Sequence, residues 1–131
     1  MTDTPRNPAI RVTAMPADAN AYGDIFGGWL MSLMDMGAGL IAARFSRGRA
    51  VTVAMDGMQF HLPVKIGDEV SVYGALLGIG RSSMTIEVEA WRRHRHEADE
   101  VKVTEAVFTF VAVDEDGKSR RIEREDEGSG G

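Results

Sequence analysis

The stretch that decides the fold is GGWLMSLMDMGAGLIAARF, residues 27–45. It contains no proline, and its large apolar side chains recur at spacings of three, four and seven residues: Leu30, Leu33, Met34, Ile41 and Phe45. That recurrence has the period of a helix with one buried face. We therefore expect a single long helix over these residues.

Two glycines in the middle of this helix need an explanation. Gly37 and Gly39 each cost about 0.5–1 kcal/mol relative to alanine in a helix interior. The simplest compensation is a strand or a ligand that packs close to the helix backbone. A sheet that wraps around the helix would provide it.

The sequence pattern predicts β-strands for most of the rest of the chain. A short alternating run at Ile10, Val12 and Ala14 precedes a loop over residues 17–24, and four long strand-like runs follow the helix: 50–62, 68–77, 82–94 and 101–113. The links 63–67 and 78–81 are short and contain glycine, so we expect hairpins and an antiparallel sheet. The expected fold is α+β: a hotdog fold, in which an antiparallel sheet wraps around one long central helix.

Composition narrows the class of protein. The 131 residues, 44% of them hydrophobic, fit a single domain, with an ordered core over about residues 8–122 and flexible ends at 1–8 and 123–131. The formal net charge of -5 argues against a nucleic-acid partner. The chain has no cysteine, so we expect no disulfides. It has no long apolar stretch, so we expect no membrane span. Together these features favour a cytoplasmic location.

Asp35 is the most informative residue, because an unpaired charge inside an apolar helix is costly to bury. It either faces solvent or pairs with an arginine, or it acts as a catalytic base or nucleophile on an apolar wall. The pattern of residues alone leaves these alternatives open.

Gly27 and Gly28 stand at the start of the helix, where unpaired amide N–H groups can polarise a carbonyl oxygen. A tight turn into the helix is the alternative reason for two glycines. Gly27 and Asp35 are about 12 Å apart along a helix, too far to act on one carbonyl. If both act, the site needs a homodimer in which each protomer supplies one group.

The segment MPADANAYGDIFGGW, residues 15–29, resembles the entry segment of bacterial YciA-type acyl-CoA thioesterases. The resemblance covers about residues 10–125 and includes MDMG (34–37), GRSS (80–83) and AVFTFVAVD (106–114). It implies a hotdog fold and hydrolysis of acyl-CoA to free acid and CoA. It also implies that no metal or separate cofactor is needed, and that dimers assemble into a homohexamer, a trimer of dimers.

The same resemblance assigns roles to single residues. Asp35 would attack the thioester or activate water, and the Gly27 amide would donate to the carbonyl oxygen. Asn20 would orient water, or would only form an Asx turn. Asp24 is a further candidate site residue, or it only caps the helix at its positive end. Tyr22 stands where the family usually has asparagine.

A second group of residues is expected near the CoA nucleotide. Arg81, Ser82 and Ser83 match a family segment there, and arginine with turn N–H groups suits phosphate. An ordinary solvated turn is the alternative. Arg120 and Arg121 would meet phosphates or balance the acidic tail.

The histidines give weak signals. His94 and His96 would share one face of a strand, as a metal pair requires, but their cationic neighbours favour a solvated strand end. His61 is expected to be structural.

Two classes of function remain in view. The leading hypothesis is an acyl-CoA thioesterase of fatty acid metabolism, and the alternative is a non-catalytic domain that binds acyl-CoA. A hotdog dehydratase is disfavoured, because residues 27–45 contain no histidine.

Overall fold

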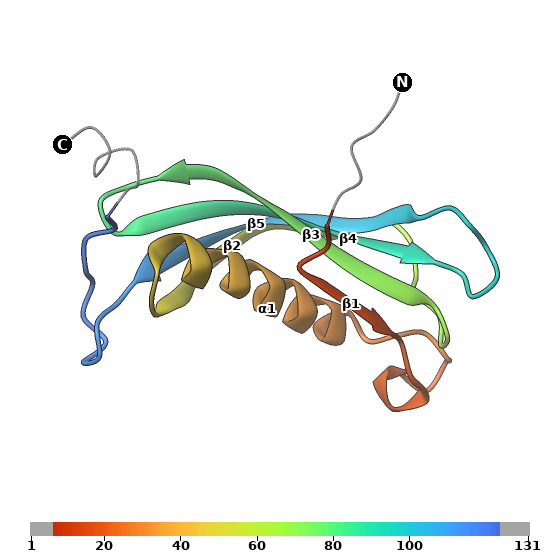
Figure 1. Ribbon diagram of the computed structural model, residues 1–131. Helices are drawn as coiled ribbons and strands as arrows, with labels where there is room; N and C mark the ends of the chain where they lie inside the picture. The colour runs from red at the N-terminus through yellow and green to blue at the C-terminus, as the bar shows by residue number, and fades with distance from the viewer. Residues whose placement is uncertain (1–6, 124–131) are drawn as a thin grey trace, which may run out of the picture.

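The computed structural model describes residues 7–123. One antiparallel sheet lies over one side of the long helix α1, Gly27–Ser46 (Figure 1). Its five strands are β1 (Ile10–Thr13), β2 (Ala50–Phe60), β3 (Glu69–Ile79), β4 (Ser83–Arg93) and β5 (Val101–Ala112), and a 3₁₀ turn, η1 (Pro16–Asp18), lies in the loop before α1. The predicted α+β hotdog architecture is confirmed.

The order of strands in the sheet is β1-β3-β4-β5-β2. The predicted hairpin at residues 78–81 is confirmed, because β3 pairs directly with β4. The predicted hairpin at residues 63–67 is wrong, because β4 and β5 lie between β2 and β3. Residues 61–68 instead cross one end of the sheet, which they can do because eight extended residues reach about 26 Å and three strand spacings need only about 14 Å.

The core lies between α1 and the sheet. Its most deeply buried helix residues are Leu30, Met34, Ala38 and Ala42, and they pack against side chains that alternate along the central strands: Met84, Ile86, Val88, Ala106, Phe108 and Phe110. This alternation gives the sheet one face that is buried against α1 and one that is more exposed. Within residues 7–123, no helix is both long and apolar enough to cross a membrane.

The predicted close approach of a strand to the helix glycines is confirmed at Gly37. A Cβ atom added there would stand 2.9 Å from Cγ1 of Val72 on β3, which is fully buried. At Gly39 the nearest atom to an added Cβ is a ring carbon of Phe110, at an ordinary 3.7 Å. The two glycines therefore differ: β3 requires the first, and the sheet tolerates a side chain at the second.

The predicted flexible ends, residues 1–8 and 123–131, fall almost wholly outside the described residues. That expectation stays a prediction.

The two glycines make a matched pair of substitutions. We expect Gly37→Ala to lower the free energy of unfolding by about 1 kcal/mol, because overpacking against Val72 outweighs the gain in helix propensity. Gly39→Ala gains the same propensity without a clash, so it should raise the free energy of unfolding by up to about 1 kcal/mol. Urea unfolding at one protomer concentration measures both, and equal effects would contradict the assignment.

Candidate active site

Asp35 is held by a hydroxyl group. It lies on the partly exposed side of α1 that faces β2, and its Oδ1 accepts a hydrogen bond of 2.5 Å from Oγ1 of Thr52. Within residues 7–123 no cationic side chain forms an ion pair with Asp35, so the predicted arginine partner is absent there. Oδ2 has no hydrogen-bond donor among those residues. The carboxylate is thus fixed by one oxygen and free at the other.

The start of α1 presents two unused donors. Phe26 is the N-cap residue and makes no side-chain cap, while the amides of Trp29 and Leu30 donate to its carbonyl oxygen. Among the described residues, the amide N–H groups of Gly27 and Gly28 have no hydrogen-bond partner. This helix start has the unpaired donors that the sequence predicted, and no side chain covers them by capping.

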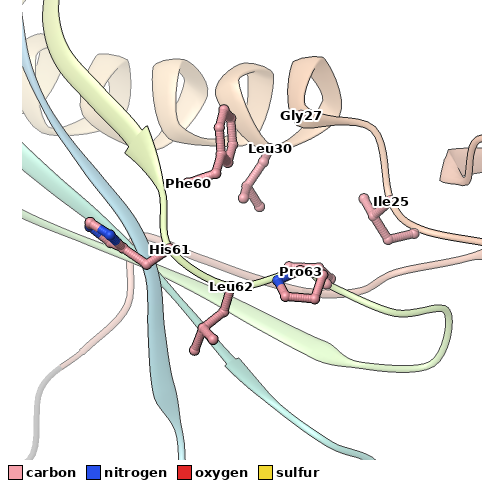
Figure 2. Close-up of a pocket in the computed structure, with 8 residues that line it drawn as sticks. Ile25, Gly27, Leu30, Phe60, His61, Leu62 and Pro63 are labelled. Carbon is pink, nitrogen blue, oxygen red and sulfur yellow. The ribbon is translucent and has the colours of Figure 1, made fainter.

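A pocket of about 370 Å³ opens beside Gly27. Its lining comes from the start of α1 and from the segment that leaves β2: Ile25, Gly27, Leu30, Phe60, His61, Leu62, Pro63 and Val64. Figure 2 shows the Phe60 ring rising from the end of β2 toward α1, with the Leu30 side chain hanging from α1 beside it. The pocket is therefore mainly apolar, with hydrogen-bond donors at one wall.

Gly27 and Asp35 do not meet within one chain. Asp35 does not line the pocket, and the helix holds the two residues about 12 Å apart along its axis. The expectation that a second chain completes the site stays a prediction.

The predicted helix cap at Asp24 is wrong. The N-cap is Phe26, and the Asp24 carboxylate instead forms an ion pair and hydrogen bond with Nζ of Lys65. The backbones of the same two residues form an isolated antiparallel bridge. Asp24 stands two residues before the N-cap and binds the segment that crosses the sheet end, so it fixes the loop and leaves the helix amides uncovered.

Asn20 forms the Asx turn that was one of its two predicted roles. Its Oδ1 accepts hydrogen bonds from the amides of Tyr22, at 2.8 Å, and Asp24, at 3.1 Å. Tyr22 stands at the tip of this turn with 89% of its surface exposed. The turn occupies only the oxygen of the Asn20 carboxamide, so the water-orienting role stays a prediction.

The turn of Arg81, Ser82 and Ser83 joins β3 to β4 at the end of the sheet away from Gly27 (Figure 1). Across the sheet, Thr52 on β2 pairs with Phe110 on β5, and Phe110 pairs with Met84 on β4. Ser83, the last residue of the turn, directly precedes Met84. The turn therefore ends one residue from the row of paired residues that contains Thr52. Two strand spacings make this distance across the sheet about 10 Å. The turn lies nearer to Asp35 than to Gly27, and its nucleotide-binding role stays a prediction.

Arg120 has a structural role that neither prediction named. Its guanidinium donates to the carbonyl oxygens of Ser46, Arg49 and Val113 at 2.9–3.2 Å, which closes the C-terminal end of α1. Its Nη2 would lie 2.6 Å from a Cβ atom added to Gly48. The donors of this arginine are consumed by main-chain carbonyls.

His94 belongs to the structure of a turn. Its Nδ1 lies 2.7 Å from Oδ1 of Asp68, whose side chain is buried and also accepts from the amide of Lys65. No group of three metal-ligating side chains occurs within residues 7–123. Both histidines lie after β4, which ends at Arg93, so the expectation that they share one face of a strand is wrong.

Two ion pairs on the sheet face away from α1 shift pKa values. A hydrogen bond of 2.6 Å from Lys102 lowers the pKa of the Glu105 carboxyl and raises that of the Lys102 ammonium. A hydrogen bond to Glu69 likewise raises the pKa of the Arg93 guanidinium. These pairs lie outside the pocket.

Thr52 was missed by sequence reasoning. It lies 17 residues after Asp35, in a strand whose alternation gives no sign that one hydroxyl meets a helix carboxylate. Only the packing of β2 against α1 reveals the pair.

The helix-and-sheet architecture and the position of Asp35 define a hotdog-fold protein with a helix carboxylate. The thioesterase superfamily profile matches residues 22–98. The chain is 56% identical over 115 residues to an uncharacterized acyl-CoA thioester hydrolase of Zymomonas mobilis, covering 88% of this chain and 77% of that one. It is 47% identical over 126 residues to the acyl-CoA thioester hydrolase YciA of Salmonella typhimurium, covering 93% and 95%.

Solved structures agree with this assignment. A hexameric thioesterase from Yersinia pestis superposes with a TM-score of 0.86 at 48% identity, covering 90% of this chain and 96% of that one. A hexameric hotdog fold thioesterase from Campylobacter jejuni gives a TM-score of 0.83 at 37% identity, covering 88% and 90%. This chain belongs to the thioesterase superfamily and, within it, to the YciA-type acyl-CoA thioester hydrolases.

Proposed function

We propose that this protein hydrolyses acyl-CoA thioesters to free acids and CoA. The observation that carries the proposal is the amide of Gly27, which has no hydrogen-bond partner among the described residues and belongs to a residue that lines a mainly apolar pocket. The same helix carries Asp35, a carboxylate with one free oxygen. The names of the similar proteins, which are acyl-CoA thioester hydrolases and hexameric thioesterases, support this substrate class.

The proposed site is shared between two copies of this chain. Gly27 and Asp35 are about 12 Å apart in one chain, whereas one thioester carbonyl must reach both. Among residues 7–123 the edge strand β2 has no partner on its outer side, and it exposes apolar side chains at Val51 and Val53. A symmetric dimer across this edge, assembled further into a hexamer, would bury them and bring the two groups together.

The proposed reaction uses each group once. The Gly27 amide donates a hydrogen bond to the thioester carbonyl oxygen and stabilises the oxyanion that develops on it. Asp35 of the other protomer attacks the carbonyl carbon, or removes a proton from an attacking water. The carbon–sulfur bond then breaks, and CoA leaves as a thiolate that takes up a proton. Where Asp35 is the nucleophile, the acyl group remains on it as a mixed anhydride, and water hydrolyses that anhydride to release the free acid and restore the carboxylate. Where Asp35 is the base, the attacking water supplies the second oxygen of the free acid directly. Thr52 positions the carboxylate by holding Oδ1, so that Oδ2 performs the attack or accepts the proton.

The remaining site residues have supporting roles in this proposal. Asn20 orients water through its carboxamide nitrogen, while its oxygen holds the loop. Arg81, Ser82 and Ser83 bind the phosphates of CoA from a turn that lies on the Asp35 side of the sheet. The guanidinium of Arg81 is exposed and has no partner among the described residues, which suits a phosphate ligand.

We also propose that the reaction needs no metal or separate cofactor and takes place in the cytoplasm, as part of fatty acid metabolism. The donor and the carboxylate supply the oxyanion stabilisation and the nucleophile or base, so acyl transfer to water has its parts. The absence of cysteine is compatible with a reducing compartment.

The test of this function is CoA release from short, medium and long acyl-CoA, followed with a thiol reagent. We expect wild-type protein to hydrolyse some or all of them. Asp35→Asn and Asp35→Ala should each lower kcat at least about 100-fold while the hexamer and its unfolding free energy persist. Saturable acyl-CoA binding without any release would assign the protein to the non-catalytic binding class instead.

Removal of one N–H group tests the oxyanion donor. Proline is well tolerated at the first position of a helix but lacks the amide hydrogen. We expect Gly27→Pro to lower kcat about 100- to 1,000-fold relative to Gly27→Ala, which adds the same Cβ atom beside Phe60 but keeps the N–H group. Equal losses in the two variants would show that bulk, and not the donor, matters.

The same variants test whether the site is shared. When Gly27→Pro and Asp35→Ala chains are refolded together, half of the dimers are mixed, and each mixed dimer has one intact site of two. About one quarter of wild-type activity should therefore return. If both groups acted from one chain, the mixture would stay as inactive as its parts.

Thr52 is tested by a pair of substitutions that differ in the hydroxyl group. Thr52→Val keeps the shape of the side chain and removes the hydrogen bond to Asp35, so kcat should fall about 10- to 100-fold with KM nearly unchanged. Thr52→Ser keeps the hydroxyl and should stay within a few fold of wild type. A rise in KM alone would show that Thr52 serves substrate binding and does not position the carboxylate.

A further inference from the structure

Phe60 stands directly against the proposed oxyanion donor. It is the last residue of β2, and Cζ of its ring lies 3.1 Å from the position that a Cβ atom on Gly27 would take. About half of the Phe60 surface, 49%, remains exposed, so the ring is a wall of the pocket and not a filled part of the core. Figure 2 shows it beside Leu30, which closes the pocket toward the core.

The side chains around this pocket are hydrocarbon. Ile25, Leu30, Phe60, Leu62, Pro63 and Val64 carry no polar side-chain atom. His61 is the only ionisable residue of the lining, and its ring is turned to the other side of the strand, where Nε2 lies 4.0 Å from Oε2 of Glu105 (Figure 2). A group that enters the pocket therefore meets mainly hydrocarbon side chains, with the Gly27 amide at one wall.

We infer that this pocket receives the hydrocarbon part of the acyl group, and that the ring of Phe60 sets the length and breadth of chain it accepts. The inference rests on the proposed thioesterase function. A carbonyl oxygen bound to the Gly27 amide places the acyl substituent within a few ångströms of the Phe60 ring, because that ring lies against the same residue. Phe60 is thus a specificity-determining residue that touches the substrate next to the reacting carbonyl.

Opposite substitutions at this one position test the inference. The measured quantity is kcat/KM for acetyl-, butyryl-, hexanoyl-, octanoyl- and isobutyryl-CoA, each divided by the value for acetyl-CoA in the same preparation. This division cancels any change in the fraction of active protein. In wild type the ratio should rise by up to about fourfold for each methylene that the pocket buries, and then level off.

Phe60→Ala should move the levelling-off point to longer chains and raise the ratio for branched isobutyryl-CoA at least about fourfold. Phe60→Trp should move the same point to shorter chains. Leu77→Ala is the matched control, because Leu77 is exposed to a similar degree, 57%, but does not line the pocket. Its ratios should equal those of wild type.

The outcomes separate the inference from the function on which it rests. Hydrolysis with the same chain-length ratios in wild type, Phe60→Ala and Phe60→Trp would overturn the role of Phe60 and leave the thioesterase function standing. An equal loss for every substrate would make Phe60 a structural residue and would also overturn the inference. No hydrolysis of any substrate by wild type would overturn both.

Discussion

At Gly37 the backbone of α1 lies so close to β3 that an added Cβ atom would stand 2.9 Å from Cγ1 of Val72. This contact sets the distance between the helix and the sheet. That distance in turn determines which side chains of the neighbouring strands can reach the helix. Asp35 stands two residues earlier on the same helix, and Thr52 reaches it from β2 with a bond of 2.5 Å. A short hydroxyl group can span the gap only where the helix and the sheet approach this closely.

The helix and the strands could be predicted because each is recorded in a local period of the sequence. The 3.6-residue period over residues 27–45 and the alternation in the later runs give α1 and the four long strands nearly to their ends. The order of the strands could not be read in this way. Residues 63–67 satisfy the length and composition of a hairpin, but α1 delivers β2 to the far edge of the sheet, and the link then has to cross β5 and β4. Connection length limits which strands can be neighbours without deciding it.

The functional and structural residues around the candidate site differ in the same way: some could be predicted from the sequence and others could not. Asp35 and Gly27 were predictable, since an acid in an apolar helix and a glycine at a helix start each need a chemical reason. Thr52 and Arg120 were not, because their roles depend on contacts between elements far apart in sequence. A residue that is unusual for its position, such as an acid in an apolar helix, can be recognised in the sequence. A contact between two ordinary residues can be recognised only in the structure.

The strand β2 links both halves of the proposed site. Near its beginning Thr52 holds Asp35, and at its end Phe60 lies against Gly27. The helix residues are about 12 Å apart, but eight regular strand residues span about 26 Å. The pairing of β2 with β5 shifts register between Thr52 and Ala54 and again between Asp56 and Gln59, where Gly57 has a φ of +72°. Two such irregularities shorten a strand by a few ångströms and bend it, and the Phe60 side chain reaches back toward α1 (Figure 2), so β2 contacts the helix at both points. The glycine in the second shift has the freedom that this bend requires, which ties the spacing of carboxylate and pocket to the geometry of one edge strand.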